Sequence, residues 1–258
     1  MSELVLRPES VTRDSLVMVA RCLRLSRRTL DALIMSLVLP VMLMLLFVYL
    51  FGGAIQTGGD YVQYVVPGVI LLSAGFASAQ TAVSVAQDMQ GGIIDRFRSM
   101  DIGGPAVLAG HVVASVARNV VSTVVVFGVA LLIGFRPTAG LTQWLAAAGV
   151  LLAFMLAISW LSAAMGLLAG NPEAAAGFTF FVAFLPYPSS AFVPVQTMPA
   201  WLHGVANHQP VTPVIETVRG HLLGLPVGTH AWVALAWCAG ILVASVALSA
   251  VLFRRRTA

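Results

Sequence analysis

The stretch from Pro137 to Pro172, PTAGLTQWLAAAGVLLAFMLAISWLSAAMGLLAGNP, contains no aspartate, glutamate, arginine or lysine. A helix that crosses a bilayer needs about 20 consecutive apolar residues, because every backbone amide must be hydrogen-bonded inside the hydrocarbon. This stretch is long enough for one such helix and its connecting turns. It therefore predicts that the chain spans a membrane.

Further stretches without aspartate, glutamate or arginine lie on both sides of the first, at residues 32–59, 61–87, 119–135, 174–215 and 220–253. The longest holds one helix, because prolines break its second half. The shortest is bracketed by Arg118 and Arg136, which we expect at its two ends as snorkelling anchors. The fold expected is an all-α polytopic membrane protein with six transmembrane helices, near residues 33–54, 62–86, 112–135, 143–168, 174–195 and 231–253.

The composition agrees with a single membrane domain over residues 1–258. Hydrophobic residues make up 59% of the 258 and charged residues only 9%, against about a quarter in a soluble domain. All 14 basic residues are arginine. The absence of lysine excludes an ATP-binding Walker loop and a Schiff-base enzyme. Cys22 and Cys238 lie too far apart in sequence for a CxxC metal or redox motif.

The distribution of arginine predicts the orientation. Twelve of the fourteen fall before the first span, between the second and third, or at the C-terminus, and only Arg136 and Arg219 fall on the other side. Because arginine is enriched in cytoplasmic loops, we expect both termini and the 88–118 loop in the cytoplasm.

Residues 14–30 are predicted to form an amphipathic helix on the inner membrane surface. Leucine and valine lie on one face, and Arg21, Arg24 and Arg28 recur at helical spacing on the other. Two interpretations are open: a surface anchor, or an elbow that transmits motion from a cytoplasmic partner into the first span.

The 88–101 loop mixes both charge signs with an apolar stripe that includes Ile94 and Phe97. Gly91 and Gly92 permit a sharp turn, after which a short helix would present apolar side chains flanked by Asp95, Arg96 and Arg98. The residues alone leave two interpretations open, a docking element for another protein and a plain linker.

The outer segment 196–230 is apolar yet rich in proline. We expect short re-entrant helices that cap a cavity, since such backbone is tolerated at membrane depth only when protein or a water-filled vestibule surrounds it. A membrane-interface loop anchored by Trp201 is the alternative. The histidines of this segment match no metal-ligand spacing, so we predict no metal site.

Glu216 and Arg219 share a helix face if residues 211–223 are helical, so the two side chains can pair. Beyond pairing, we predict that this helix caps the exit of a pathway, with the turn at Pro210 and Pro213 as its hinge and Arg219 holding it against a neighbouring carbonyl or a partner subunit.

Two groups of apolar side chains are candidates to line a pathway: Met42 and Met44 on the first span, and Phe178, Phe181 and Phe184 on the fifth. Ordinary helix packing or lipid contact is the alternative.

All ten acidic residues fall outside the six predicted spans. An ion-driven transporter usually keeps a carboxylate at membrane depth to bind the coupling ion. A transporter with this sequence must therefore take its energy from another polypeptide. Two rival functions are a membrane scaffold or channel component without an ATPase partner, and a lipid-modifying enzyme. The second is disfavoured because nucleophile, base and metal ligands do not occur together.

Three segments, in this order and spacing, resemble the permeases of ABC type-2 exporters, in particular the daunorubicin-resistance-like drug-efflux branch. They are residues 88–99, residues 189–202, and residues 207–213 followed by Arg219, Gly220 and Gly224. The resemblance covers about nine-tenths of the chain. The sequence departs from the family pattern at Asp101, where a proline is common, and at His111, where a basic residue is common.

The resemblance implies a subunit of an ATP-driven exporter for a hydrophobic or amphipathic drug, antibiotic or lipid-like compound. It further implies a bacterial cell membrane, a second permease copy, a separate cytoplasmic ATPase that binds ATP and Mg, and no nucleic-acid partner. No cofactor is expected in this chain. The residues implied to couple to the ATPase are Asp88, Gly91, Gly92, Ile94, Asp95, Arg96, Phe97 and Arg98.

Overall fold

The computed structural model describes residues 30–55, 57–91 and 104–257, and this part of the chain is helical without a strand. The elements follow one another as α2 (Leu30–Leu46), the π-helical turn η1 (Phe47–Phe51), α3 (Tyr61–Gln90), α5 (Gly104–Leu132), α6 (Leu141–Leu168), α7 (Pro172–Phe184), the short 3-10 turn η2 (Val195–Thr197), α8 (Ala200–His208), α9 (Val211–Leu223) and α10 (His230–Thr257).

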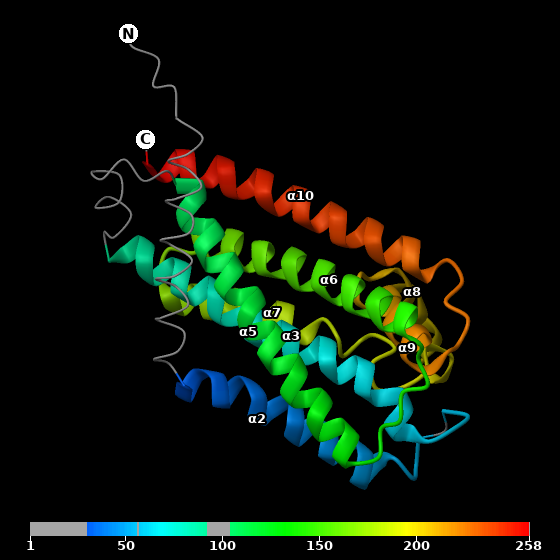
Figure 1. Ribbon diagram of the computed structural model, residues 1–258. Helices are drawn as coiled ribbons and strands as arrows, with labels where there is room; N and C mark the ends of the chain where they lie inside the picture. Colours follow the sequence, from blue (N-terminus) through cyan, green and yellow to red (C-terminus); the bar gives the residue numbers. More distant parts are fainter. Residues whose placement is uncertain (1–29, 56, 92–103, 258) are drawn as a thin grey trace.

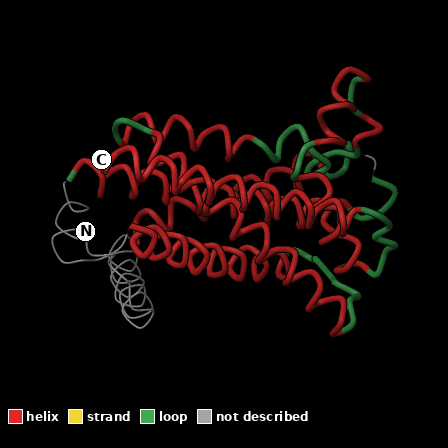
Figure 2. The backbone as a smooth tube through the Cα atoms, turned by 90° about the horizontal axis from the view of Figure 1, so that it is seen from above, coloured by secondary structure: helices red, strands yellow, loops and turns green. Residues whose placement is uncertain are grey.

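The long helices lie roughly side by side, with most of the described connections at the two ends of the bundle (Figures 1 and 2). α10 finishes at the end where α3 also stops and α5 starts, which we call the C-terminal end. The short helices α8 and α9 lie at the opposite end, which we call the α9 end. Successive long helices thus alternate in direction, as expected of a chain that crosses a bilayer repeatedly.

Helix α3 is the central element. It packs against α2, α5, α6, α7 and α9, and 72% of its most apolar window is buried, against 17% for α10. Two glycines permit close approaches of α3 to other segments: a Cβ on Gly68 would lie 2.6 Å from the Cα of Ala191, and one on Gly166 of α6 would lie 2.5 Å from the carbonyl oxygen of Ala82. Small residues at such contacts are typical of membrane helix packing.

The described helices bear out the apolar pattern of the sequence. Four are long and apolar enough to cross a membrane: Tyr61–Gln90, Val107–Leu132, Leu141–Leu168 and His230–Leu252. Two shorter apolar helices, Leu37–Phe51 and Pro172–Phe184, fall where the first and fifth spans were expected. The chain is therefore a multi-pass membrane protein.

The expected fifth helix, 174–195, is too long. α7 stops at Phe184, and residues 185–193 form turns before η2 begins. Pro186 and Pro188 supply no backbone N–H, and a proline disfavours the helical conformation of the residue before it. The prolines therefore end the helix at Phe184, halfway along the expected span 174–195.

The expected position of Arg118 at a helix end is also wrong. α5 is continuous from Gly104 to Leu132, so Arg118 lies in its middle. Its side chain faces α3, where NH2 donates to Thr81 Oγ1 at 2.8 Å. A buried partner on a neighbouring helix thus replaces the expected snorkelling to the interface. The first span also differs, because its last turn is the π-helical η1 rather than regular α-helix to residue 54.

Candidate functional site

Helix α9 is built from local signals at both ends. Pro210 precedes its first residue and Pro213 lies in its first turn, where the missing N–H costs no helical hydrogen bond. Gly224 ends the helix in the left-handed conformation, with φ of 66°, which glycine adopts without strain. The short helices expected before the last span are therefore present, as α8 and α9.

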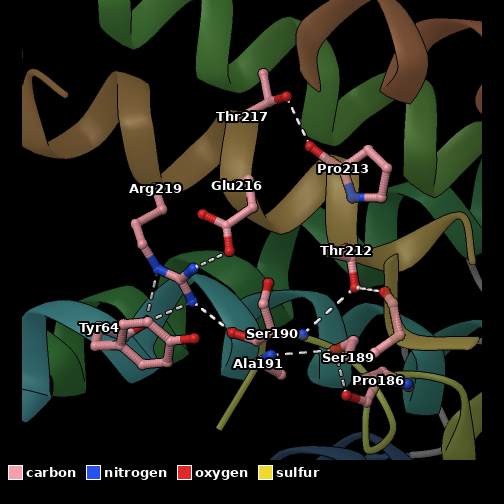
Figure 3. Close-up of polar contacts among 11 residues, drawn as sticks. Tyr64, Pro186, Ser189, Ser190, Ala191, Thr212, Pro213, Glu216, Thr217 and Arg219 are labelled. Atoms are coloured by element: carbon pink, nitrogen blue, oxygen red, sulfur yellow. Dashed lines mark hydrogen bonds and ion pairs between the residues drawn. The ribbon is translucent and has the colours of Figure 1, made fainter. Parts of the chain in front are cut away.

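Arg219 is the charged centre of α9. Only 5% of its side chain is exposed. Its Nε and NH2 donate to the backbone carbonyl of Tyr64 on α3 at 3.1 and 3.0 Å, and NH2 also donates to the carbonyl of Ser190 at 2.7 Å (Figure 3). One guanidinium group thus joins α9, α3 and the turn segment that follows α7. We call this arrangement the Arg219 clasp.

Two further contacts complete the Arg219 clasp. The guanidinium carbon lies 3.8 Å from the centre of the Tyr64 ring, a cation-π contact. NH1 donates to Glu216 Oε1 at 2.6 Å, which is the pairing that the three-residue spacing predicts. Glu216 keeps 29% of its side chain exposed, so the arginine is buried while the carboxylate reaches the edge of the site.

The turn segment 185–193 is held by side chains from its neighbours. Tyr61 of α3 donates its hydroxyl to the carbonyl of Phe192 at 2.8 Å, and Gln209 donates to the carbonyl of Pro188. The amide of Ser190 donates to Thr212 Oγ1, whose hydroxyl in turn donates to the carbonyl of Ala206 (Figure 3).

These bonds meet a physical requirement of non-helical backbone in a membrane protein. Carbonyl groups that are not paired within a helix must find donors elsewhere, because lipid offers none. In the described residues, α3, α9 and the connection between α8 and α9 supply those donors to the turn segment. The arrangement can hold irregular backbone closed against the bundle, which is what the sequence leads us to expect of a re-entrant cap.

Sequence reasoning identified Glu216, Arg219, Pro210 and Pro213 but missed Tyr64 and Ser190. These two residues contribute backbone carbonyls, and a carbonyl carries no signature in the side-chain pattern. The sequence predicted that Arg219 holds α9 against a neighbouring carbonyl or a partner subunit, but it could not say which carbonyls would be the acceptors.

The candidate pathway residues do not share one environment. Met42 of α2 and Phe181 of α7 are exposed, at 59% and 74%, and Phe178 and Phe184 are also exposed on α7. Met44 is fully buried in the main apolar core, so it packs the interior of the subunit rather than its surface. Ring contacts run from Phe180 through Phe184 to Tyr187, so part of this aromatic face stacks on itself.

The candidate coupling residues are described only in part. Asp88 lies in the last turn of α3, and its Oδ2 lies 3.0 Å from Nε2 of His111 on α5. Gly91 caps α3, with its amide donating to the carbonyl of Gln87. Outside the described residues lie the predicted interfacial helix 14–30, apart from Leu30, and the other coupling residues, Gly92, Ile94, Asp95, Arg96, Phe97 and Arg98.

Two histidines of the α9 end hydrogen-bond to backbone carbonyls. His203 hydrogen-bonds to the carbonyl of Met198 and His208 to that of Gly204, both at 2.9 Å. The described part of the chain holds no group of three His, Cys, Asp or Glu side chains that could bind a metal ion.

Comparison with known proteins identifies the family to which this helical architecture belongs. The family described as ABC-2 type transporter matches residues 14–223, which include every described helix except α10. The chain belongs to the ABC-2 type transporter family. It is therefore a multi-pass membrane permease, the non-catalytic membrane component of an ABC transporter, and the resemblance seen in the sequence is confirmed.

Individual relatives agree with the family. The chain is 31% identical over 228 residues to the daunorubicin resistance ABC transporter permease protein DrrB1 of Streptomyces coeruleorubidus, which covers 88% of this chain and 81% of the relative. It is 26% identical over 244 residues to the "Probable doxorubicin resistance ABC transporter permease protein DrrC" of Mycobacterium tuberculosis, covering 94% and 88%. These matches favour a transporter permease over a scaffold or channel component.

Proposed function

We propose that this permease moves a hydrophobic or amphipathic compound outward across a bacterial cell membrane, using ATP hydrolysis on a separate cytoplasmic subunit that binds ATP and Mg. The observation that carries the proposal is the family match over residues 14–223. The names of two relatives, which refer to resistance to daunorubicin and doxorubicin, support a drug-like compound. The apolar, aromatic-rich surface of α2 and α7 supports a compound of low polarity.

We further propose six spans with both termini in the cytoplasm, which places the C-terminal end of the bundle inside and the α9 end outside. The four long and two shorter apolar helices supply six candidates. Eleven of the fourteen arginines belong to segments assigned to the cytoplasm once Arg118 is placed within α5, and this asymmetry still supports the orientation.

The orientation predicts a labelling pattern. Single cysteines at Thr57→Cys and Arg256→Cys, in a background without Cys22 and Cys238, are treated on intact cells with an impermeant thiol reagent. Position 57 should react and position 256 should react only after the cells are opened. Labelling of 256 but not 57 in intact cells contradicts the topology.

Coupling to the ATPase is assigned to the 88–101 segment, in which Asp95, Arg96 and Arg98 orient the contact and Ile94 or Phe97 supplies the buried anchor. A buried aromatic anchor contributes about 2 kcal/mol or more to an interface, whereas an exposed ion pair contributes less than about 1. The segment is thus expected to bind mainly through its apolar side chains.

The ATPase encoded beside this chain should co-purify with it, and Phe97→Ala should reduce its recovery about tenfold or more while Arg98→Ala reduces it only slightly. The measurement is quantitative pull-down from detergent extract at matched permease amounts. Full recovery with Phe97→Ala and Ile94→Ala combined shows that the ATPase binds elsewhere. No recovery with the wild-type chain removes the proposed function.

The Arg219 clasp supports a role for α9 as the outer cap of the pathway. Pro210 and Pro213 provide the turn on which α9 could move relative to α8, and Arg219, paired with Glu216 within α9, ties this helix to α3 and the turn segment. A permease of this class acts with a second copy, so we assign the exposed side chains Met42, Phe178, Phe181 and Phe184 to a face shared by the compound and the second permease, most simply in a homodimer.

A further inference from the structure

A second buried polar cluster lies between α3, α5 and α6, in the half of the bundle nearer the C-terminal end. Neither the sequence patterns above nor the proposed function uses it as a unit. We call it the polar zipper, and its members are Ser78, Thr81 and Asp88 of α3, His111, Ser115, Arg118 and Asn119 of α5, and Ser159 of α6.

Three rungs join α3 to α5 in one antiparallel register. Asn119 Nδ2 donates to Ser78 Oγ at 2.8 Å and Arg118 NH2 to Thr81 Oγ1 at 2.8 Å. The third rung is the 3.0 Å contact of His111 Nε2 with Asp88 Oδ2. Positions rise along α3 as they fall along α5, so the rungs fix the relative height of the two helices.

The same cluster attaches α6. Ser159 Oγ donates to Ser115 Oγ at 2.9 Å, and Asn119 Nδ2 lies 3.5 Å from Ser159 Oγ. Asn119, Ser78, Ser115 and Ser159 are all completely buried. Asn119 therefore stands at the point where the three helices meet, with its amide directed to both neighbours.

Stability alone does not explain why these buried side chains are polar. Asn119 Oδ1 is buried without a hydrogen-bond partner in the described part of the chain, and a leucine, which branches in the same way but has no polar atom, would avoid that cost. Polar groups in an apolar interior are best known for fixing one register of helices against alternatives. A fixed register matters when one helix has to carry the movement of another.

The polar zipper lies between the coupling segment and the Arg219 clasp, where a fixed helix register could transmit movement. Asp88 lies in the last turn of α3 and His111 about two turns into α5, so their contact joins the two helices that flank residues 92–103. At its other end, α3 presents the Tyr64 carbonyl to the Arg219 clasp. One continuous helix of 30 residues, about 45 Å long, thus connects the two polar clusters.

We propose that the polar zipper is the joint that locks α5 and α6 to α3, so that a displacement at the coupling segment moves the three helices together and reaches α9 through α3. Asn119 and His111 are positioning residues in this inference. They touch neither the compound nor ATP, and they set how efficiently ATP hydrolysis is linked to transport. The inference rests on the proposed function.

The decisive variant is Asn119→Leu, which keeps the number and branching of the side-chain heavy atoms and removes the central rung. The freed hydroxyls of Ser78 and Ser159 can bond to carbonyls of their own helices. Ser84→Ala is the matched control, because Ser84 also lies on α3 but donates only to the carbonyl of Gln80 within that helix. The permease and its ATPase are reconstituted together in liposomes, with doxorubicin as the probe.

We expect the Asn119→Leu permease to co-purify with the ATPase subunit and to retain basal ATP hydrolysis. Probe-stimulated ATP hydrolysis and the amount of probe transported per ATP should both fall about fivefold or more. Ser84→Ala should match the wild type in every measurement. Wild-type coupling by Asn119→Leu overturns the inference, and so does a loss of transport that only parallels a loss of assembled complex. A wild-type complex that neither binds the ATPase nor transports the probe instead refutes the proposed function.

A second pair of variants keeps the test decisive if Asn119→Leu does not assemble. His111→Leu should uncouple the complex, whereas His111→Arg, which can still pair with Asp88, should restore most of the probe transported per ATP. Equal coupling by these two variants overturns the role of the third rung.

A covalent replacement of the central rung tests rigidity directly. Ser78→Cys with Asn119→Cys, in a background without Cys22 and Cys238, should be uncoupled when reduced and should regain coupling when a short thiol-bridging reagent links the two positions. If the cross-link leaves coupling unchanged or lowers it further, α3 and α5 do not act as one locked unit.

Discussion

Arg219→Ala is expected to lower the free energy of unfolding of the permease by about 3 kcal/mol, the largest loss from any single side chain of α9. The substitution removes charged hydrogen bonds to two carbonyls, the contact with the Tyr64 ring and the pair with Glu216. Hydrogen bonds to charged groups are worth more than neutral ones, and removing the buried member of an ion pair costs several kcal/mol.

The expected order of variants distinguishes the Arg219 clasp from a simple ion pair. Glu216→Ala should cost only about 1 kcal/mol, because its carboxylate is partly exposed and the arginine keeps its carbonyl partners. Arg219→Lys should be intermediate, since one ammonium group lacks the planar fork that reaches both carbonyls. Thermal unfolding in detergent, followed by the fraction that stays monodisperse, measures all three.

Equal destabilisation by Arg219→Ala and Glu216→Ala contradicts this ranking, because it would mean that the ion pair alone carries the stability. The same variants test the cap. If α9 gates the exit, assembled Arg219→Lys complexes should lose probe-stimulated ATP hydrolysis and export, and wild-type export by such complexes would remove any gating role for this residue.

Gly68→Ala is expected to destabilise the permease by about 1 to 3 kcal/mol through overpacking. The added Cβ would lie 2.6 Å from both the Cα and the carbonyl oxygen of Ala191. Those atoms belong to the backbone of the turn segment that the Arg219 clasp holds against α3, so they cannot move aside as a flexible side chain can. The same unfolding assay measures the effect.

Gly149→Ala in α6 is the matched control for this substitution. A Cβ at Gly149 meets nothing within 4 Å, and alanine favours the helix by up to about 1 kcal/mol over glycine. We therefore expect opposite signs for two chemically identical changes. If Gly68→Ala is as well tolerated as Gly149→Ala, the close contact between α3 and the turn segment is not present in the folded protein.

The sequence predicts the long helices well because their signal is strong. Residues 61–87, 141–168 and 230–253 carry no charge, which leaves no alternative to a helix in a bilayer, and the observed helix ends lie within about four residues of those predicted. The family follows from short motifs whose order is fixed by these helices.

Two of the errors, the place of Arg118 and the length of the fifth helix, have a common cause. Each was predicted from the residue itself, a charged arginine or an apolar stretch, whereas the structure at that position depends on contacts with neighbouring helices. Arg118 was placed at a helix end because an arginine usually avoids membrane depth, yet Thr81 on α3 gives it a partner inside the bundle. The fifth helix was extended through Pro186 because its residues are apolar, yet donors from α3 and α9 allow irregular backbone there.

The candidate site was predictable only where it depends on sequence spacing. Glu216 and Arg219 are three positions apart, and that spacing correctly predicts their pair. The carbonyls of Tyr64 and Ser190 come from other parts of the chain and depend on how α3 packs. The polar zipper could have been predicted in part, because the sequence places His111, Ser115 and Asn119 at four-residue spacing on one face of a helix.

The central claim is that this chain exports its compound only with a partner that hydrolyses ATP, and doxorubicin accumulation in inside-out membrane vesicles tests it most directly. Vesicles that contain the permease and its ATPase should accumulate the probe with ATP, and should not do so with ADP or when either chain is omitted. Accumulation of the same size from the permease alone, driven by a proton gradient without the ATPase, would contradict it.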